Sequence, residues 1–156
     1  MEEFLPRFTS ELDETFHSSA PLASVRDHFA DIEAVITHYG HLERADRQDP
    51  LTVRFTLPRK NHGVATFNGR YTCRWEVVDD HTVRWSTIGD DNNMWSTGEA
   101  RFRAGGGKTL MEYRHEIVID LDVNRMLAKV IAGVVREVTR RELRAYVGRM
   151  LASVPA

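Results

Sequence analysis

The sequence predicts an α+β fold in which a seven-stranded, curved antiparallel sheet grips one long C-terminal helix. The stretch 122–151 contains no proline and repeats apolar residues at steps of three and four, as a helix with one buried stripe does. Before it, 41–120 has strand-like segments separated by turn-forming residues, which indicates an antiparallel sheet. The expected order is one strand, two helices, six strands and one helix. The apolar stripe of the last helix consists of Leu127, Val130, Ile131, Val134 and Val138.

The N-terminal forty residues predict a strand followed by two helices. Apolar and polar residues alternate over 7–17, which is the pattern of a strand with one buried face. Pro21 suits the first turn of a helix, and Gly40 ends the helical pattern. We place a break near Ala30-Asp31, because two short helices can close one end of a sheet compactly.

Six strands are expected between Gly40 and the last helix. Each is bounded by residues that favour turns, such as Asp49-Pro50 and Gly105-Gly106-Gly107. Long strands joined by such short turns form an antiparallel meander. The expected strands are 41–47, 51–57, 64–78, 81–89, 94–104 and 108–120.

The composition is that of one ordinary globular domain, which we expect to span 1–156. Hydrophobic residues make up 42% of the chain, and the net charge is only −2, which excludes an intrinsically disordered protein. A nucleic-acid-binding domain is normally basic with clustered lysine and arginine, so no nucleic-acid partner is expected.

Location is predicted from what the sequence lacks. Cys73 is alone, so no intrachain disulfide forms and a reducing compartment is suitable. The first residues contain no basic segment and no long apolar stretch, so we expect a cytoplasmic protein. The longest apolar run, Val130 to Val135, is far shorter than the roughly 20 residues that span a bilayer, so no transmembrane segment is expected.

This order of elements resembles the START-like, or helix-grip (SRPBCC), superfamily, which includes pollen-allergen-like proteins, polyketide cyclases and dehydratases, and lipid or quinone carriers. The resemblance covers essentially the whole chain. The passage from the first strand into Ser18–Val25 is similar to the family's opening of strand, small residues, proline and helix, and 122–151 is similar to its closing helix. The resemblance implies a ligand cavity between the sheet and the last helix, and a small hydrophobic molecule as partner.

Strand parity identifies the side chains that face this cavity, because successive side chains alternate between the two faces of a sheet. On 108–120 the even positions are mostly charged, so the odd positions lie inside. Three small residues in succession on the inner face of 94–104 predict a void there, since a dense core would need bulk. The predicted ligand-binding residues are Phe67, Tyr71, Trp75, Trp85, Thr87, Ser96, Gly98, Ala100, Tyr113, His115, Met126, Val130 and Val134.

Tyr113, His115 and Glu14 are the candidate catalytic residues. Buried polar groups need partners, so each belongs either to a structural network or to a ligand site. A carboxylate on the inner face of the first strand pairs with a cation, has a raised pKa, or indicates a wrong register. For Glu14 we expect a one-residue slip or bulge that turns the side chain to solvent.

No metal or cofactor site is expected. His38 and His41 are three residues apart, but no third ligand stands at a metal-site spacing. Asp90-Asp91-Asn92-Asn93 lacks the glycine and the terminal glutamate of a calcium loop. Gly107-Lys108-Thr109 ends like a phosphate-binding loop but is followed by a strand.

These features support one leading functional hypothesis and two alternatives. The leading hypothesis is binding or carrying of a small hydrophobic or aromatic ligand between the sheet and the last helix. The first alternative is a polyketide cyclase/dehydratase-like enzyme that acts on an aromatic or polyketide substrate, in which the three candidate catalytic residues serve as acid, base and oxyanion partner. Whether a reaction is catalysed stays open, as does the oligomeric state, a homodimer included. The second alternative is a protein-interaction domain that uses outer-face arginines, namely Arg70, Arg74, Arg84, Arg101, Arg103 and Arg114.

Overall fold

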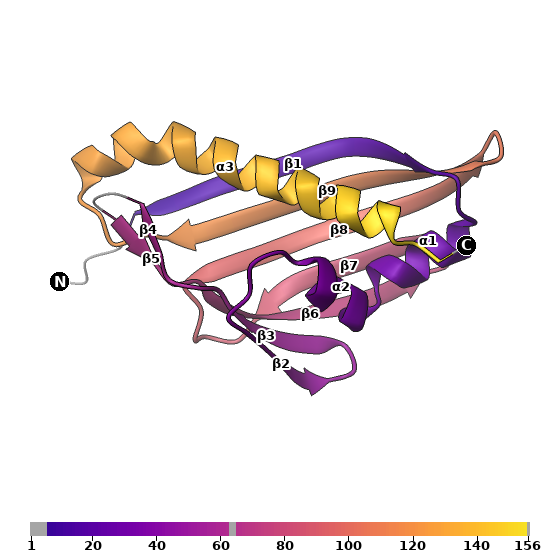
Figure 1. The fold of residues 1–156 in the computed structure, drawn as a ribbon, viewed down its shortest axis with the longest axis horizontal. Helices are drawn as coiled ribbons and strands as arrows, with labels where there is room; N and C mark the ends of the chain where they lie inside the picture. The colour runs from indigo at the N-terminus through magenta and orange to yellow at the C-terminus, as the bar shows by residue number, and fades with distance from the viewer. Residues whose placement is uncertain (1–5, 63–64, 156) are drawn as a thin grey trace.

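A seven-stranded antiparallel sheet curves around a long C-terminal helix, as predicted (Figure 1). The computed structural model describes residues 6–62 and 65–155. The elements are, in chain order, β1 (Arg7–Ser18), α1 (Leu22–Phe29), α2 (Ile32–His38), β2 (Arg44–Asp49), β3 (Thr52–Thr56), β4 (Lys60–His62), β5 (Ala65–Phe67), β6 (Arg70–Asp79), β7 (Thr82–Ile88), β8 (Met94–Gly105), β9 (Lys108–Asp120) and α3 (Arg125–Ala152).

The strand order of the sheet is β1-β9-β8-β7-β6-β3-β2. Strands β6 to β9 form a meander in which each strand pairs with the next. The first strand of the chain pairs with the last, without a register shift, from Arg7 opposite Asp120 to Ser18 opposite Thr109. This regular register fixes the parity of β1 and β9, so alternate side chains of both strands point toward α3.

The predicted strand 64–78 is in fact two strands, and this is a correction. β5 leaves the main sheet and pairs with β4, whereas β6 stays in the sheet beside β3 and β7. The break falls at Asn68 and Gly69. The Asn68 side chain donates a hydrogen bond to the carbonyl of Leu57, and a Cβ on Gly69 would lie 3.0 Å from the Phe67 ring. Glycine therefore permits the close packing at which the chain changes sheets.

The two N-terminal helices are separated where the sequence predicts. α1 ends at Phe29, with Ala30 as its C-cap, and the Asp31 side chain accepts a hydrogen bond from the backbone N–H of Glu33. Asp31 is thus the N-cap of α2, which starts a second helix instead of extending the first. Figure 1 shows both helices near the C-terminal end of α3.

α3 begins after Asn124, whose side chain accepts a hydrogen bond from the N–H of Leu127. Its inward face differs from the prediction. Met126, Val130 and Val134 are 80%, 72% and 64% exposed, so most of each side chain faces solvent, although Val134 also borders the outer cavity. The N-terminal half of α3 is apolar on more than one side, and periodicity alone does not choose between two apolar stripes. Among the described residues, no helix is both long enough and apolar enough to cross a membrane.

Candidate functional site: two adjoining cavities beneath the C-terminal helix

Two cavities lie between the sheet and α3. The inner one has a volume of about 110 Å³ and the outer one about 430 Å³. The exposed residues Lys60 and Arg149 line the outer cavity, which therefore reaches the surface. The two cavities adjoin, because they share the lining residues Tyr39, Leu57, Met94, Ile117, Thr139 and Glu142.

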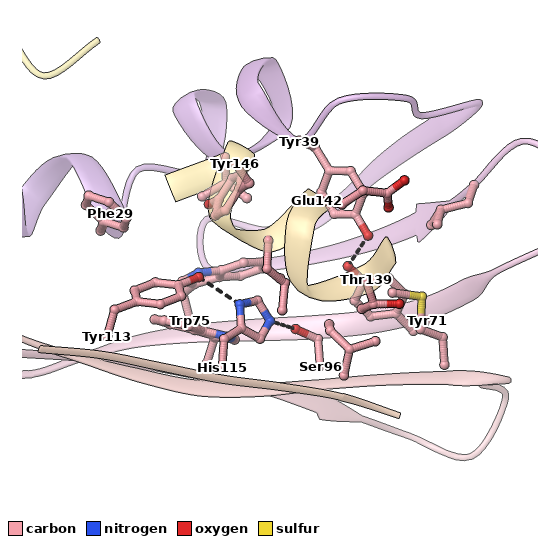
Figure 2. Close-up of a pocket in the computed structure, with 16 residues that line it drawn as sticks. Phe29, Tyr39, Tyr71, Trp75, Ser96, Tyr113, His115, Thr139, Glu142 and Tyr146 are labelled. Carbon is pink, nitrogen blue, oxygen red and sulfur yellow. Dashed lines mark hydrogen bonds between the residues drawn. The ribbon is translucent and has the colours of Figure 1, made fainter. Parts of the chain in front are cut away.

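Three buried polar side chains form a hydrogen-bonded triad on the floor of the inner cavity (Figure 2). The Tyr113 hydroxyl lies 2.7 Å from Nδ1 of His115, and the Ser96 hydroxyl lies 2.7 Å from Nε2 of the same ring. Tyr113 and His115 are alternate residues of β9, so both point inward. Ser96 comes from the neighbouring strand β8, where Gly98 is opposite His115.

The triad is electrically neutral at neutral pH. Burial lowers the pKa of His115 to about 3 and raises the pKa of the Tyr113 hydroxyl well above its usual value. A neutral imidazole carries one N–H, so the triad holds three polar hydrogens and makes two internal hydrogen bonds. Whichever ring nitrogen is protonated, one hydroxyl hydrogen is left without an acceptor among the described residues. We call it the surplus hydrogen.

Two further phenols face the same cavity. The hydroxyls of Tyr39 and Tyr71 are 2.5 Å apart, and burial raises the pKa of both. Tyr39 follows α2, and its ring stacks on Phe55 with centroids 4.8 Å apart. Figure 2 shows this pair beside Thr139 of α3. Two hydroxyls joined by one hydrogen bond again leave one hydrogen available to an acceptor.

Trp85 forms part of the wall next to the triad. Its ring centroid is 5.4 Å from that of Tyr113 and 5.2 Å from that of His115. Within the described part of the chain, its indole N–H has no hydrogen-bond partner. A Cβ on Gly98 would lie 2.2 Å from this ring, so Trp85 fills the space above Gly98. The predicted void over the small residues of β8 is therefore wrong at Gly98.

The structure brings together six of the predicted ligand-binding residues. The inner cavity is lined by Tyr71, Trp75, Trp85, Ser96, Tyr113 and His115, whereas Phe67 and Val134 line the outer one.

The other predicted residues do not line either cavity. Thr87 instead binds the backbone of Ser96: its hydroxyl donates to the carbonyl and accepts from the N–H. Ala100 is fully buried, and Met126 and Val130 lie on the outward face of α3. For Thr87 and Ala100 parity gave the correct face but not what covers it, whereas for Met126 and Val130 periodicity selected the wrong face of the helix.

Glu14 also corrects the prediction. β1 contains no bulge opposite β9, and Glu14 stands opposite Tyr113 on the inner side of the sheet. Its carboxylate accepts a hydrogen bond from Nε of Arg144 in α3, at 3.0 Å, and lines neither cavity. It is thus paired with a cation, not turned to solvent by a register slip, and it lies outside the candidate site.

Sequence reasoning missed the roof of the inner cavity. The helical positions Thr139, Glu142, Leu143 and Tyr146 are three, one and three residues apart and line the inner cavity. These positions continue the helix face that begins with Ile131 and Val135, because each follows at a step of three or four residues. Extending that face along the sequence would have identified the four residues. Phe29, Val35 and Tyr39 are also part of the lining, although they come from the N-terminal helices, which were expected only to close the sheet.

No protein-family model matches this sequence, and no curated protein sequence matches it either. Solved structures do match. TTHA0849 of Thermus thermophilus has a TM-score of 0.68 and 14% identity, covering 92% of this chain and 96% of that one. The Zhui aromatase/cyclase of Streptomyces sp. R1128 has a TM-score of 0.66 and 14% identity, covering 94% and 93%. Truncated norcoclaurine synthase of Thalictrum flavum has a TM-score of 0.59 and 10% identity, covering 96% of both chains.

At such low identities the likeness concerns the fold. The chain has the helix-grip, or START-like, fold that the order of its elements resembles. Among the residues that the structure describes, no group of three or more histidine, cysteine or acidic residues is placed to hold a metal ion.

Proposed function

We propose that the protein binds a small, largely apolar molecule that carries an oxygen acceptor, and that the Tyr113–His115–Ser96 triad holds this oxygen. The observation that carries the proposal is the surplus hydrogen of the triad. A donor without an acceptor is costly in a buried site, and a ligand carbonyl or ether oxygen would satisfy it. Apolar walls with a few fixed polar groups are typical of sites for small molecules.

The size of the cavities indicates a ligand of more than one ring. A cavity of about 150 Å³ holds a benzene molecule, so the inner cavity, at about 110 Å³, suits no more than one ring or acyl group. The rest of the ligand would extend past Leu57 and Thr139 into the outer cavity. Trp75, Trp85 and Tyr113 provide flat aromatic surfaces for the inner part.

A cyclase-like enzyme is the second candidate, and Glu142 is the observation that favours it. Its carboxylate side chain lines both cavities. With the surplus hydrogen it would supply a base and an enolate-stabilising donor, as proton abstraction beside a ketone requires. His115 is a poor base at neutral pH, because burial lowers its pKa to about 3. The geometry therefore supports binding of a carbonyl better than proton removal by the triad.

The test compares two ligands of nearly equal shape, 2-acetylnaphthalene and 2-ethylnaphthalene, by titration calorimetry. The wild type should prefer the ketone by roughly fivefold, because one hydrogen bond contributes about 1 kcal/mol. The triple variant Ser96→Ala/Tyr113→Phe/His115→Leu removes both hydroxyls and also the ring N–H, which would otherwise be left free to donate to the ketone. It should lose this preference and keep its affinity for the hydrocarbon. Ser86→Ala, an exposed hydroxyl deletion on β7, is the matched control and should behave as the wild type does.

A triple variant that still prefers the ketone would show that a group outside the triad holds the ligand oxygen. A wild type that binds neither compound would contradict the proposed function itself. To examine the enzymatic candidate, Glu142→Gln and the wild type would be incubated with an aromatic poly-β-ketone. Loss of water from it in the wild type alone would favour catalysis over carriage.

A further inference from the structure

Met126, Val130 and Val134 form an apolar stripe on the outside of the molecule. Each is four residues from the next, so all three lie on one face of α3. They are the most exposed large apolar residues of the described chain. Contiguous exposed apolar side chains mark a surface that meets another apolar phase or partner. The stripe serves neither the core nor the inner cavity.

The same half of α3 carries cations that have no acidic partner. Among the described residues, no ion pair or hydrogen bond involves the side chains of Arg125, Lys129 or Arg136, and all three are exposed. The chain as a whole has a net charge of −2, so this positive surface is local. Apolar and basic residues together on a helix are typical of a surface that binds anionic membranes.

The stripe reaches the mouth of the outer cavity. Val134 belongs to the stripe and also lines that cavity, together with Ile131 and Val135 from the inward side of the helix. Lys60 of β4 and Phe67 of β5 line it too, and Figure 1 shows this half of α3 at the outer edge of the molecule, near the β4–β5 hairpin. An apolar molecule that leaves the cavity here would emerge beside the stripe.

We propose that the N-terminal half of α3 docks on an anionic lipid surface, with Met126 and Val130 inserted among the lipids and the flanking cations on the head groups. Charge favours this occupant over a second copy of the chain. Two such faces brought together would oppose their own unpaired cations, whereas an anionic bilayer would neutralise them. The apolar stripe is one helix face wide, so it suits a helix lying in the interface.

The experiment is co-sedimentation of the purified protein with vesicles of phosphatidylcholine, alone or mixed with phosphatidylglycerol. The wild type should bind the mixed vesicles about tenfold more tightly than phosphatidylcholine alone, and added salt should weaken this binding. Two variants should each lose about tenfold in affinity: Met126→Ser/Val130→Ser removes the apolar contact, and Lys129→Glu/Arg136→Glu reverses two charges. All four positions are exposed, so the fold should be kept, which thermal unfolding verifies.

The matched control is Val77→Ser/Ile88→Ser, which removes exposed apolar groups elsewhere and should not alter vesicle binding. Failure of the wild type to sediment with the mixed vesicles would overturn the proposal, as would binding that neither α3 variant changes. A protein that dimerises in solution through this face, with Met126→Ser/Val130→Ser monomeric, would assign the stripe to a second copy and also overturn it. No ligand is needed, so the result is separate from that of the calorimetric test.

Discussion

The two halves of α3 meet the same sheet in different ways. In the C-terminal half Leu143, Val147 and Met150 are buried, and the helix packs directly on the core beside α1 and α2. In the N-terminal part, over 125–142, no residue is buried, and the helix covers the two cavities. One helix therefore serves as a roof over its N-terminal part and as an anchor at its C-terminal end, and Leu143 and Tyr146, where the two parts meet, also line the inner cavity. Val147 and Met150 belong to the core alone, whereas Val138 and Thr139 line a cavity.

The largest contrast is expected from placing one charge in each half. Val147→Asp buries an unpaired carboxylate at a fully buried position and should cost more than about 4 kcal/mol. Val138→Asp, on the roof of the outer cavity, can reach water and should cost about 1 kcal/mol. Urea unfolding midpoints of the two variants measure the difference. Equal costs would mean that the roof is packed as tightly as the anchor.

The pH dependence of stability should reflect the burial of His115 in the inner cavity beneath α3. His115 has a folded-state pKa lowered to about 3 by burial, while the unfolded chain titrates near 6.5. Below pH 6.5 the unfolded state binds a proton that the folded state does not. The free energy of unfolding therefore decreases as the pH is lowered from about 6.5 to about 3.

The slope from this residue is roughly 1 kcal/mol for each pH unit, measured as the urea midpoint between pH 7 and 4. His115→Gln cannot titrate and should show a flatter dependence. Burial also lowers the pKa of His28, which contributes in the same direction and remains in the variant as an internal reference. Identical slopes for the wild type and His115→Gln would show that the ring is hydrated.

Two glycine substitutions make a smaller contrast between floor and roof. Gly98→Ala places a Cβ 2.2 Å from the Trp85 ring and 2.6 Å from the carbonyl oxygen of Arg114, so it should cost about 1–3 kcal/mol through overpacking. Gly133→Ala, on the roof helix, meets nothing within 4 Å and should stabilise by about 1 kcal/mol. Melting temperatures that move in opposite directions would confirm both assignments.

Much of the fold could be predicted because its signals are local. Alternation identifies the strands, Asp31 separates the two N-terminal helices, and the parity of β9 places Tyr113 and His115 inside. The errors arise where a residue distant in sequence determines the position of a side chain. Glu14 stays on the inner side because Arg144, which is 130 residues away in sequence, pairs with it.

The site was predicted as a set of residues but not as an arrangement. The triad needs the register of β8 against β9, which places Ser96 within reach of His115, and no local pattern encodes that register. The filled space above Gly98 depends in the same way on a tryptophan from the neighbouring strand β7.

The pairing of β1 with β9 has a consequence for how the chain folds as it is synthesised. Arg7 and Asp120, which form an ion pair at one end of this ladder, are 113 residues apart in sequence. At about 5–20 residues per second, a ribosome needs on the order of 10 s to make that interval. During this time β1 has no partner strand, and Phe8 and Leu12 have no core to enter. The nascent protein therefore exposes an apolar strand for seconds, a period in which a chaperone that binds extended apolar segments would protect it from aggregation.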